Sequence, residues 1–254
     1  MNASHPIVIT PYYKEDPALL RRCIDSVRRQ TVATEHLLVA DGHPQGWIDL
    51  EPVRHLKLDR AHGDFGNTPR GVAALLAAAE GYSAIAMLDA DNWLEPQHME
   101  VCLGVAASKP GTDFVIARRC FRRPDESIMP VGEEPVSGHV DTSCFVFLPG
   151  SYHVLPVWAL IPTPMSTIGD RVFWTVVRTR GLSGVIITDQ ATVNYHCLWE
   201  LFYRALGEVP PPGAKANVDS EQVWNWWRTL DERDRETVER RTGVRWAAVV
   251  PAAR

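Results

Sequence analysis

Two carboxylates lie one residue apart at the end of an apolar run, in the stretch AIAMLDADNWLEP at positions 84–96. Residues i and i+2 of an extended chain project to the same side, so Asp89 and Asp91 can act on one target. Two like charges held close together repel each other unless a cation or a strong hydrogen-bond donor lies between them. The spacing favours an oxygen-bound divalent ion, Mg²⁺ or Mn²⁺. The alternative is an ordinary loop whose aspartate caps the next helix.

The segments that must position this motif alternate between strand and helix over the first 95 residues. Continuous apolar runs predict strands at 6–10, 36–42, 55–59 and 84–91, and helical spacing with Pro near the start predicts helices at 15–30 and 67–81. Strands that are apolar on both faces must be covered on both faces. We therefore expect an α/β fold, a Rossmann-like, mostly parallel sheet with helices on both sides, which binds ligands at the carboxyl ends of its strands.

The second half of the chain has a less regular pattern. It predicts a helix at 96–108, a strand at 113–121, a long loop at 122–141, a strand at 142–150, a helix at 169–181, short strands at 184–188 and 191–196, and two tail helices at 220–230 and 231–243. We divide the chain into a catalytic domain at 1–206, with halves at 1–95 and 96–206, a Pro/Gly linker at 207–218 and a helical tail at 219–254.

The tail is rich in tryptophan. Trp224, Trp226 and Trp227 are expected to form a packing stripe or a contact of a homo-oligomer, and direct binding of an acceptor is the alternative.

Composition describes a soluble globular chain, with 254 residues of which 45% are hydrophobic and 22% charged. A net charge of −5 without a Lys/Arg-dense block argues against a nucleic-acid partner. The five Cys are scattered without a C-x-x-C pair, which favours reduced, buried thiols over disulfides or a zinc site. The sequence has neither a signal-peptide pattern nor an apolar run long enough to span a bilayer, so we expect a cytoplasmic protein without a transmembrane segment.

The order of these segments resembles the inverting family 2 glycosyltransferases of the GT-A fold. IVITPYYKE is similar to the family's opening strand and donor loop, LLRRCIDSVRRQT to the next helix, LLVADG to the second strand, GNTPRGVAALLAAAEG to the helix before the metal site, and AIAMLDADNWLEP to the D-x-D strand. The likeness covers most of the first half. It implies metal-dependent transfer of a sugar, of the hexosyltransferase type, from a nucleoside diphosphate sugar, most commonly a UDP-sugar, to an unknown acceptor hydroxyl.

The resemblance also implies which residues hold the nucleotide. Pro11, Tyr12 and Glu15 would line its pocket, and Asp41 would accept a hydrogen bond from the base ring, most commonly uracil. The alternative for Asp41 is a turn from strand to loop that it forms with Gly42.

For the rest of the donor site, the resemblance assigns Arg70 to the diphosphate or the base, Asp89 to the ribose side of the metal site and Asp91 to the metal itself. A helix residue facing solvent is the alternative for Arg70. Several GT-A enzymes take a third metal ligand from a late His, which would be His196 here, and a hydrogen-bonded structural histidine is the alternative.

An inverting transfer needs a base that takes the proton of the acceptor hydroxyl. The family places an acid near the start of a helix, often within an acidic pair, and the match here is Asp170. Gly169 precedes it where a pair would have a second acid, and a simple helix cap is the alternative. Asp141 is the second candidate, as the base or as an acid that orients the acceptor.

Other functions compete with this interpretation. Haloacid-dehalogenase phosphatases also place D-x-D after an apolar strand, but Asn92 and Trp93 depart from their motif. Sugar nucleotidyltransferases have a Gly-rich opening that is missing after PIVIT. A catalytically inactive nucleotide-sugar-binding protein or scaffold is the non-enzyme alternative, and the retained Asp89 and Asp91 argue against it.

Overall fold

The computed structural model describes residues 5–132, 136–180 and 184–250. Across these residues, an eight-stranded sheet runs in the order β3-β2-β1-β4-β7-β6-β8-β5. The strands are β1 (Ile7–Tyr12), β2 (Glu35–Ala40), β3 (Arg54–Lys57), β4 (Ile85–Met87), β5 (Trp93–Leu94), β6 (Phe114–Arg122), β7 (Phe145–Phe147) and β8 (Val185–His196). Parts of the predicted loop at 122–141 and of the predicted helix at 169–181, and the last residues of the tail, lie outside the described residues.

Strands β1 to β4 are parallel, as their continuous apolar runs predict. The second half adds β6 and β8, which are parallel to each other, and β7, which is antiparallel to β4 and β6. The short β5, directly after the D-x-D motif, pairs antiparallel with β8. The runs at 184–188 and 191–196 form one strand, β8, instead of two. The hydroxyl of Thr188 donates to Gln190 O and accepts from Arg118 N. The pairing of β8 with β6 shifts register at Arg118, so the polar residues between the two runs form an irregular part of one continuous strand.

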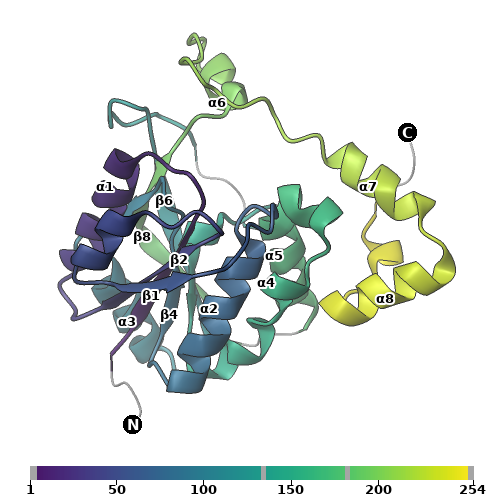
Figure 1. Ribbon diagram of the computed structural model, residues 1–254, viewed down its shortest axis with the longest axis horizontal. Helices are drawn as coiled ribbons and strands as arrows, with labels where there is room; N and C mark the ends of the chain where they lie inside the picture. The colour runs from purple at the N-terminus through teal and green to yellow at the C-terminus, as the bar shows by residue number, and fades with distance from the viewer. Residues whose placement is uncertain (1–4, 133–135, 181–183, 251–254) are drawn as a thin grey trace.

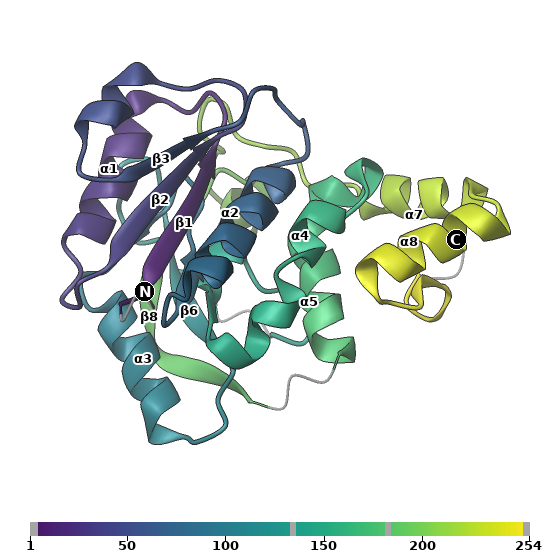
Figure 2. The ribbon, with the colours of Figure 1, turned by 60° about the horizontal axis from the view of Figure 1, so that its bottom comes forward.

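Helices cover both faces of the sheet, as expected. Figures 1 and 2 show α1 and α3 on one side and α2, α4 and α5 on the other. The helices are α1 (Pro17–Arg28), α2 (Asn67–Glu80), α3 (His98–Ser108), α4 (Val157–Leu160), α5 (Gly169–Thr179), α6 (Glu200–Ala205), α7 (Ser220–Thr229) and α8 (Glu232–Thr242), and the 3₁₀ turns used below are η2 (Thr142–Cys144) and η4 (Thr163–Ile168).

The helix ends follow the local signals in the sequence. Asp16 caps α1 by accepting a 2.7 Å hydrogen bond from Ala18 N, and Pro17 is its first residue. The helix α2 ends at Gly81, which takes the left-handed conformation with a φ of 81°. These two helices fix the loops that follow β1 and precede β4.

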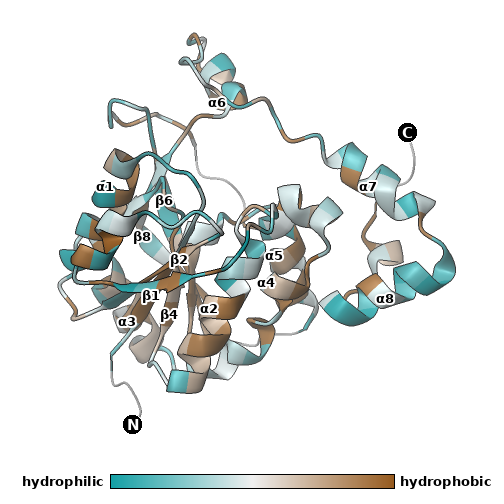
Figure 3. Ribbon diagram, viewed as in Figure 1, coloured by the Kyte–Doolittle hydropathy of each residue, from teal (hydrophilic) through white to brown (hydrophobic). Residues whose placement is uncertain are grey.

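The core is aromatic where the two halves of the sheet meet. Figure 3 shows the strands and the inner sides of α2, α4 and α5 as the hydrophobic part of the molecule. Trp158 of α4 and Phe173 of α5 are fully buried and stack with ring centroids 4.1 Å apart. Phe145 and Phe147 of β7 pack against Phe173. This packing joins α4 and α5 to the middle of the sheet.

The tail packs against the same chain. Its helix α7 lies against η4, and α8 lies against α4. Trp227 and Trp246 are almost completely buried, and the ring of Trp224 lies 6.2 Å from that of Trp246. The tryptophans therefore form a packing contact within the chain, while their use in an oligomer and the division into domains stay predictions. Within the described residues, none of the helices combines the length and apolarity that a membrane span requires.

The close approach of α2 to α4 predicts how two glycine substitutions differ. A Cβ on Gly71 of α2 would lie 2.5 Å from Ala159 N, whereas a Cβ on Gly104 of α3 would have no atom within 4 Å. We expect Gly71→Ala to lower the free energy of unfolding by about 1–3 kcal/mol through overpacking. Gly104→Ala should raise it by about 0.5–1 kcal/mol, because alanine favours the helix. Urea unfolding of both variants measures the two signs, and equal effects would contradict this packing.

Candidate active site

A cavity of about 750 Å³ opens at the carboxyl ends of β1, β2 and β4, beside the first turns of α2 and α5. The parallel arrangement explains why these strand ends share one edge. All the residues predicted for the site line this cavity except His196. The lining includes Pro11, Tyr12, Glu15, Asp41, Arg70, Asp89, Asp91, Asp141 and Asp170.

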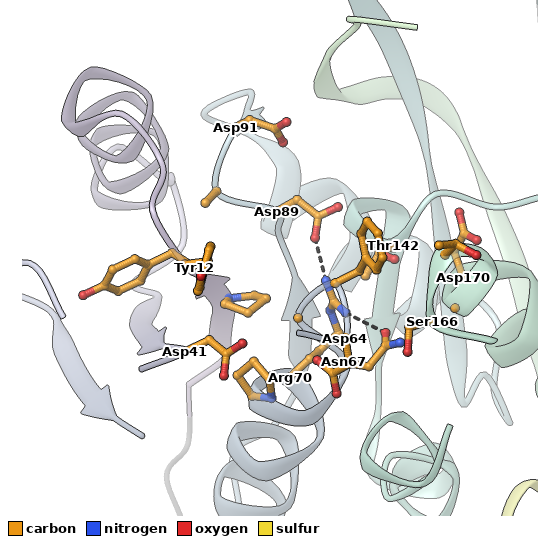
Figure 4. Close-up of a pocket in the computed structure, with 18 of the residues that line it drawn as sticks. Tyr12, Asp41, Asp64, Asn67, Arg70, Asp89, Asp91, Thr142, Ser166 and Asp170 are labelled. Carbon is orange, nitrogen blue, oxygen red and sulfur yellow. Dashed lines mark hydrogen bonds and ion pairs between the residues drawn. The ribbon is translucent and has the colours of Figure 1, made fainter. Parts of the chain in front are cut away.

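The end of β1 borders the cavity mainly through its backbone and the ring of Tyr12. The hydroxyl of Tyr12 points away from the cavity (Figure 4). It bonds to His55 Nε2 at 2.7 Å and accepts from Gln45 N at 2.9 Å. Burial raises the pKa of Tyr12 above its usual value. Glu15 accepts a hydrogen bond from Tyr13 N, which folds the loop after β1 back on itself.

Asp41 lies at a tight turn after β2 and also lines the cavity. Gly42 has a φ of 73°, and a Cβ there would lie 2.2 Å from Ala61 N, so this position is a tight turn that needs glycine. The Asp41 carboxylate bonds to His62 Nδ1 at 2.6 Å and also accepts from His62 N. Asp41 thus borders the cavity and also fixes the loop that leads to α2.

Arg70 is a buried residue, not a helix residue that faces solvent. It is 3% exposed and donates from Nη2 to Asp89 Oδ1 at 2.7 Å and from Nη1 to Asn67 Oδ1 at 3.3 Å. Its guanidinium lies 4.8 Å from the centroid of the Trp158 ring. Arg70 therefore carries a positive charge into the wall of the cavity, directly beside the D-x-D motif.

Asp91 lies at the same edge, with a cation that the sequence analysis missed. Burial, and next the charge of Asp89, raise the pKa of Asp91 to about 7. Lys215 Nζ lies 3.9 Å from Asp91 Oδ2 and counteracts this effect. Lys215 belongs to the predicted linker, which passes along the cavity and is fixed there by a hydrogen bond from Lys215 N to Leu198 O.

His196 is not brought to this cavity. It ends β8, where its backbone N–H donates to Asn92 Oδ1 at 2.9 Å. Its Nδ1 is buried without a hydrogen-bond partner. Within the described ranges, no three His, Cys, Asp or Glu side chains converge as metal ligands.

Asp170 lies in the first turn of α5, but it does not cap the helix. Its Oδ2 bonds to His139 Nε2 at 2.6 Å, and its Oδ1 accepts from Arg171 N at 2.7 Å. Burial acts to raise the pKa of Asp170, but the hydrogen bond and charge of His139 outweigh it and lower this pKa. The residue before Asp170 is glycine for a steric reason: a Cβ on Gly169 would lie 2.7 Å from Asn67 Nδ2.

Asp141 has the contacts of a structural residue as well as a place in the lining. It caps η2 by accepting from Ser143 N at 3.0 Å, and its Oδ2 pairs with Arg119 Nη1 at 3.0 Å. Burial raises the pKa of Asp141 more than Arg119 lowers it.

Two carboxylates, Asp41 and Asp170, lie on opposite sides of the ion pair of Arg70 and Asp89. In Figure 4, Asp41 lies on one side of the cavity and Asp170 on the other, with Arg70 and Asp89 between them and Asp91 beyond Asp89. An anionic group in the middle would meet Arg70 and Lys215, both of which can neutralise oxyanions. Asp170 would then be the acid or base on the far side of that group.

Among solved structures, the chain is similar to S. aureus TarS. The structure of TarS 1-349 in complex with UDP-GlcNAc has a TM-score of 0.60 and 11% identity, and the match covers 96% of this chain and 73% of that one. The complex of the same fragment with UDP has a TM-score of 0.58, 11% identity and the same coverage. A longer TarS structure has a TM-score of 0.58 and 12% identity, with 96% of this chain and 44% of that one covered. At these identities the likeness shows the fold alone.

The sequence comparisons differ in outcome. Curated protein sequences give no match to this chain. The family model described as Glycosyl transferase family 2 matches residues 7–157, which is more than half of the chain and includes β1, β2, β4 and the D-x-D motif. The chain therefore belongs to glycosyl transferase family 2, as a nucleotide-sugar-dependent glycosyltransferase with the GT-A fold.

Proposed function

We propose that this chain transfers a sugar from a UDP-sugar to an acceptor hydroxyl, with inversion at the anomeric carbon and with the help of a divalent cation. One observation carries the proposal: the predicted nucleotide residues, two cationic side chains and the candidate base Asp170 all line one cavity. The similar TarS structures contain UDP and UDP-GlcNAc, which makes UDP-sugars the first donors to test.

The residues present fit a hard divalent cation. Asp89 and Asp91 offer carboxylate oxygens, which Mg²⁺ and Mn²⁺ prefer, and the raised pKa of Asp91 indicates that its charge lacks compensation. Asp91 would hold the ion with Asp89 beside it, and the donor diphosphate and water would complete the coordination. A bound ion would stabilise the negative charge that develops on the leaving diphosphate.

Two cationic side chains of this chain would also stabilise the charge of the diphosphate. Arg70 and Lys215 approach the D-x-D motif from α2 and from the segment after α6. In the absence of a ligand, Arg70 forms a 2.7 Å ion pair with Asp89, whereas Lys215 lies 3.9 Å from Asp91 and compensates its charge only in part. When a diphosphate occupies the cavity, Arg70 and Lys215 would bind its oxygens, because charge-assisted hydrogen bonds to phosphate are among the strong ones.

The candidate base is Asp170. It faces the cavity from the side opposite Asp41 (Figure 4), and in this proposal the acceptor approaches from that side, opposite the leaving diphosphate. The oxygen of the acceptor hydroxyl would form the new bond to the anomeric carbon while Asp170 takes its proton. The bond from this carbon to the diphosphate breaks, and its electrons remain on the phosphate oxygen.

Replacement of Asp91 tests the metal role. We expect Asp91→Asn to weaken Mn²⁺-dependent binding of UDP at least about tenfold, which is about 1.4 kcal/mol, in calorimetric titrations with and without Mn²⁺. The wild type should bind UDP more tightly with Mn²⁺ than without it. A mutant that keeps both the affinity and its metal dependence would contradict the proposal. Release of UDP from a panel of UDP-sugars separates an enzyme from an inactive binding protein.

The same substitution has a predicted effect on stability. Because the folded state raises the pKa of Asp91 to about 7, its ionised form is unfavourable, and this cost is complete above pH 7. Without metal, Asp91→Asn should therefore raise Tm at pH 8. The increase should shrink as pH falls from 7 toward 4 and disappear only below about pH 3, where Asp91 is protonated in both the folded and the unfolded state. A mutant with a lower Tm at pH 8 would show that the Asp91 charge stabilises the fold.

Lys215 has a matched control. We expect Lys215→Met to weaken binding of UDP about tenfold and to leave the much weaker binding of uridine unchanged, because Lys215 would contact only the diphosphate. Lys109→Met removes the same charge from the end of α3, away from the cavity, and should change neither affinity. Equal losses for UDP and uridine in Lys215→Met would indicate a general change of the site instead.

A further inference from the structure

The segment before β7 is attached to one face of α5. Asp170, Trp174 and Arg178 are spaced four residues apart, so they share this face. Asp170 bonds to His139, Trp174 Nε1 donates to Val136 O at 2.6 Å, and Arg178 Nη1 donates to Ser137 O at 2.6 Å. Three contacts thus hold the described residues 136–139 against the helix that carries the candidate base.

The pair of His139 and Asp170 is only partly open to solvent. Each side chain is 26% exposed. Burial lowers the pKa of His139, but the hydrogen bond and charge of Asp170 outweigh it and raise this pKa above its ordinary value. The other charges that act on the pair are Arg119, which lowers the pKa of His139, Asp141, which raises it, and Arg171, which lowers the pKa of Asp170.

His139 also reaches a second cavity. This cavity, of about 370 Å³, is lined by His139 and by Asp141, and Asp141 lines the larger cavity as well. Asp170 borders the larger cavity and not the second one. The hydrogen bond from His139 to Asp170 therefore crosses the wall between the two cavities. Water in the second cavity can exchange protons with the imidazole without entering the larger one.

We propose that His139 is a positioning residue of the transfer reaction: its Nε2 holds the Asp170 carboxylate at the cavity wall, and the charge on its ring sets the pH above which Asp170 becomes an effective base. This inference rests on the proposed function. Protonated His139 stabilises the Asp170 anion and weakens it as a base, whereas neutral His139 keeps the hydrogen bond and leaves Asp170 more basic.

The proton balance of the step is simple. The hydroxyl proton of the acceptor moves to Asp170, the hydroxyl oxygen bonds to the anomeric carbon, and the diphosphate leaves with the electron pair of the broken bond. His139 donates its Nε2 proton in a hydrogen bond throughout and transfers none of it. Water can replace the acceptor hydroxyl, which gives slow hydrolysis of the donor and a reaction that needs no known acceptor.

The test compares pH profiles of this hydrolysis. UDP release from a panel of UDP-sugars is followed at saturating Mn²⁺ for the wild type and His139→Gln. We expect the wild-type rate to rise with pH along a limb centred above about 6.5, the ordinary pKa of His. In His139→Gln the amide keeps the hydrogen bond but cannot titrate, so the limb should move down by more than about one pH unit. Asp91 and Asp141 are present in both proteins, so the difference reports on position 139.

Three further variants sharpen the result. His139→Ala should lose at least about tenfold in rate at pH 8, whereas His139→Gln should stay within about threefold of the wild type, which separates positioning from loss of structure. Asp170→Asn should bind UDP and release none from the sugars. His153→Gln is the matched control, because His153 is exposed and bonds only to Gly150 O nearby. Its profile should coincide with that of the wild type.

The outcomes distinguish the two proposals. A wild type that does not bind UDP contradicts the proposed function. If the wild type binds UDP but the pH profiles of His139→Gln and wild type coincide, only the role of His139 is overturned. A wild type that binds UDP but hydrolyses no sugar of the panel also overturns it, because a base held at a filled donor site should activate water.

Discussion

Asp89 and Asp91 are held near each other at the end of β4, where their charges repel, and much of the surrounding structure compensates for this repulsion. Arg70 reaches Asp89 from α2, and Lys215 reaches Asp91 from the segment after α6. The guanidinium of Arg70 also lies 4.8 Å from the centroid of the Trp158 ring in α4. The contact between α2 and α4 is therefore part of the charged site as well as of the core.

The two halves of the chain contribute different parts of the cavity. Residues 7–157 match the family model and contain the strand ends that line one side of it. Asp170 and Lys215 come from later in the chain, beyond the matched range. A parallel sheet can present its strand ends at one edge with little variation, while the helix and segments that follow can change with the acceptor. This division is consistent with a common donor site and a variable acceptor side.

The sequence predicts the first half well because its signals are local. Apolar runs and helix caps indicate β1, β2, β4, α1 and α2, and the acids at the strand ends then follow from the parallel arrangement. Lys215 and His139 could not be found in this way, because their places depend on where a linker and a long loop fold back. From the sequence, Gly169 stands where an acidic pair would have its first acid. The structure explains why a side chain is absent there, because a Cβ on Gly169 would clash with Asn67. His196 has a residue type that suits a metal ligand and lies at a strand end, but it does not line the cavity.

The central claim is that a divalent cation at Asp91 binds the same diphosphate as the side chains of Arg70 and Lys215. A crystal structure of this chain with UDP and Mn²⁺, with anomalous scattering data to locate manganese, tests it most directly. The account predicts one manganese ion bound by Asp91 and the diphosphate, with Lys215 on a phosphate oxygen and Asp170 across the cavity from the base. Manganese bound elsewhere, or UDP bound with its diphosphate away from Asp91 and Lys215, would contradict it.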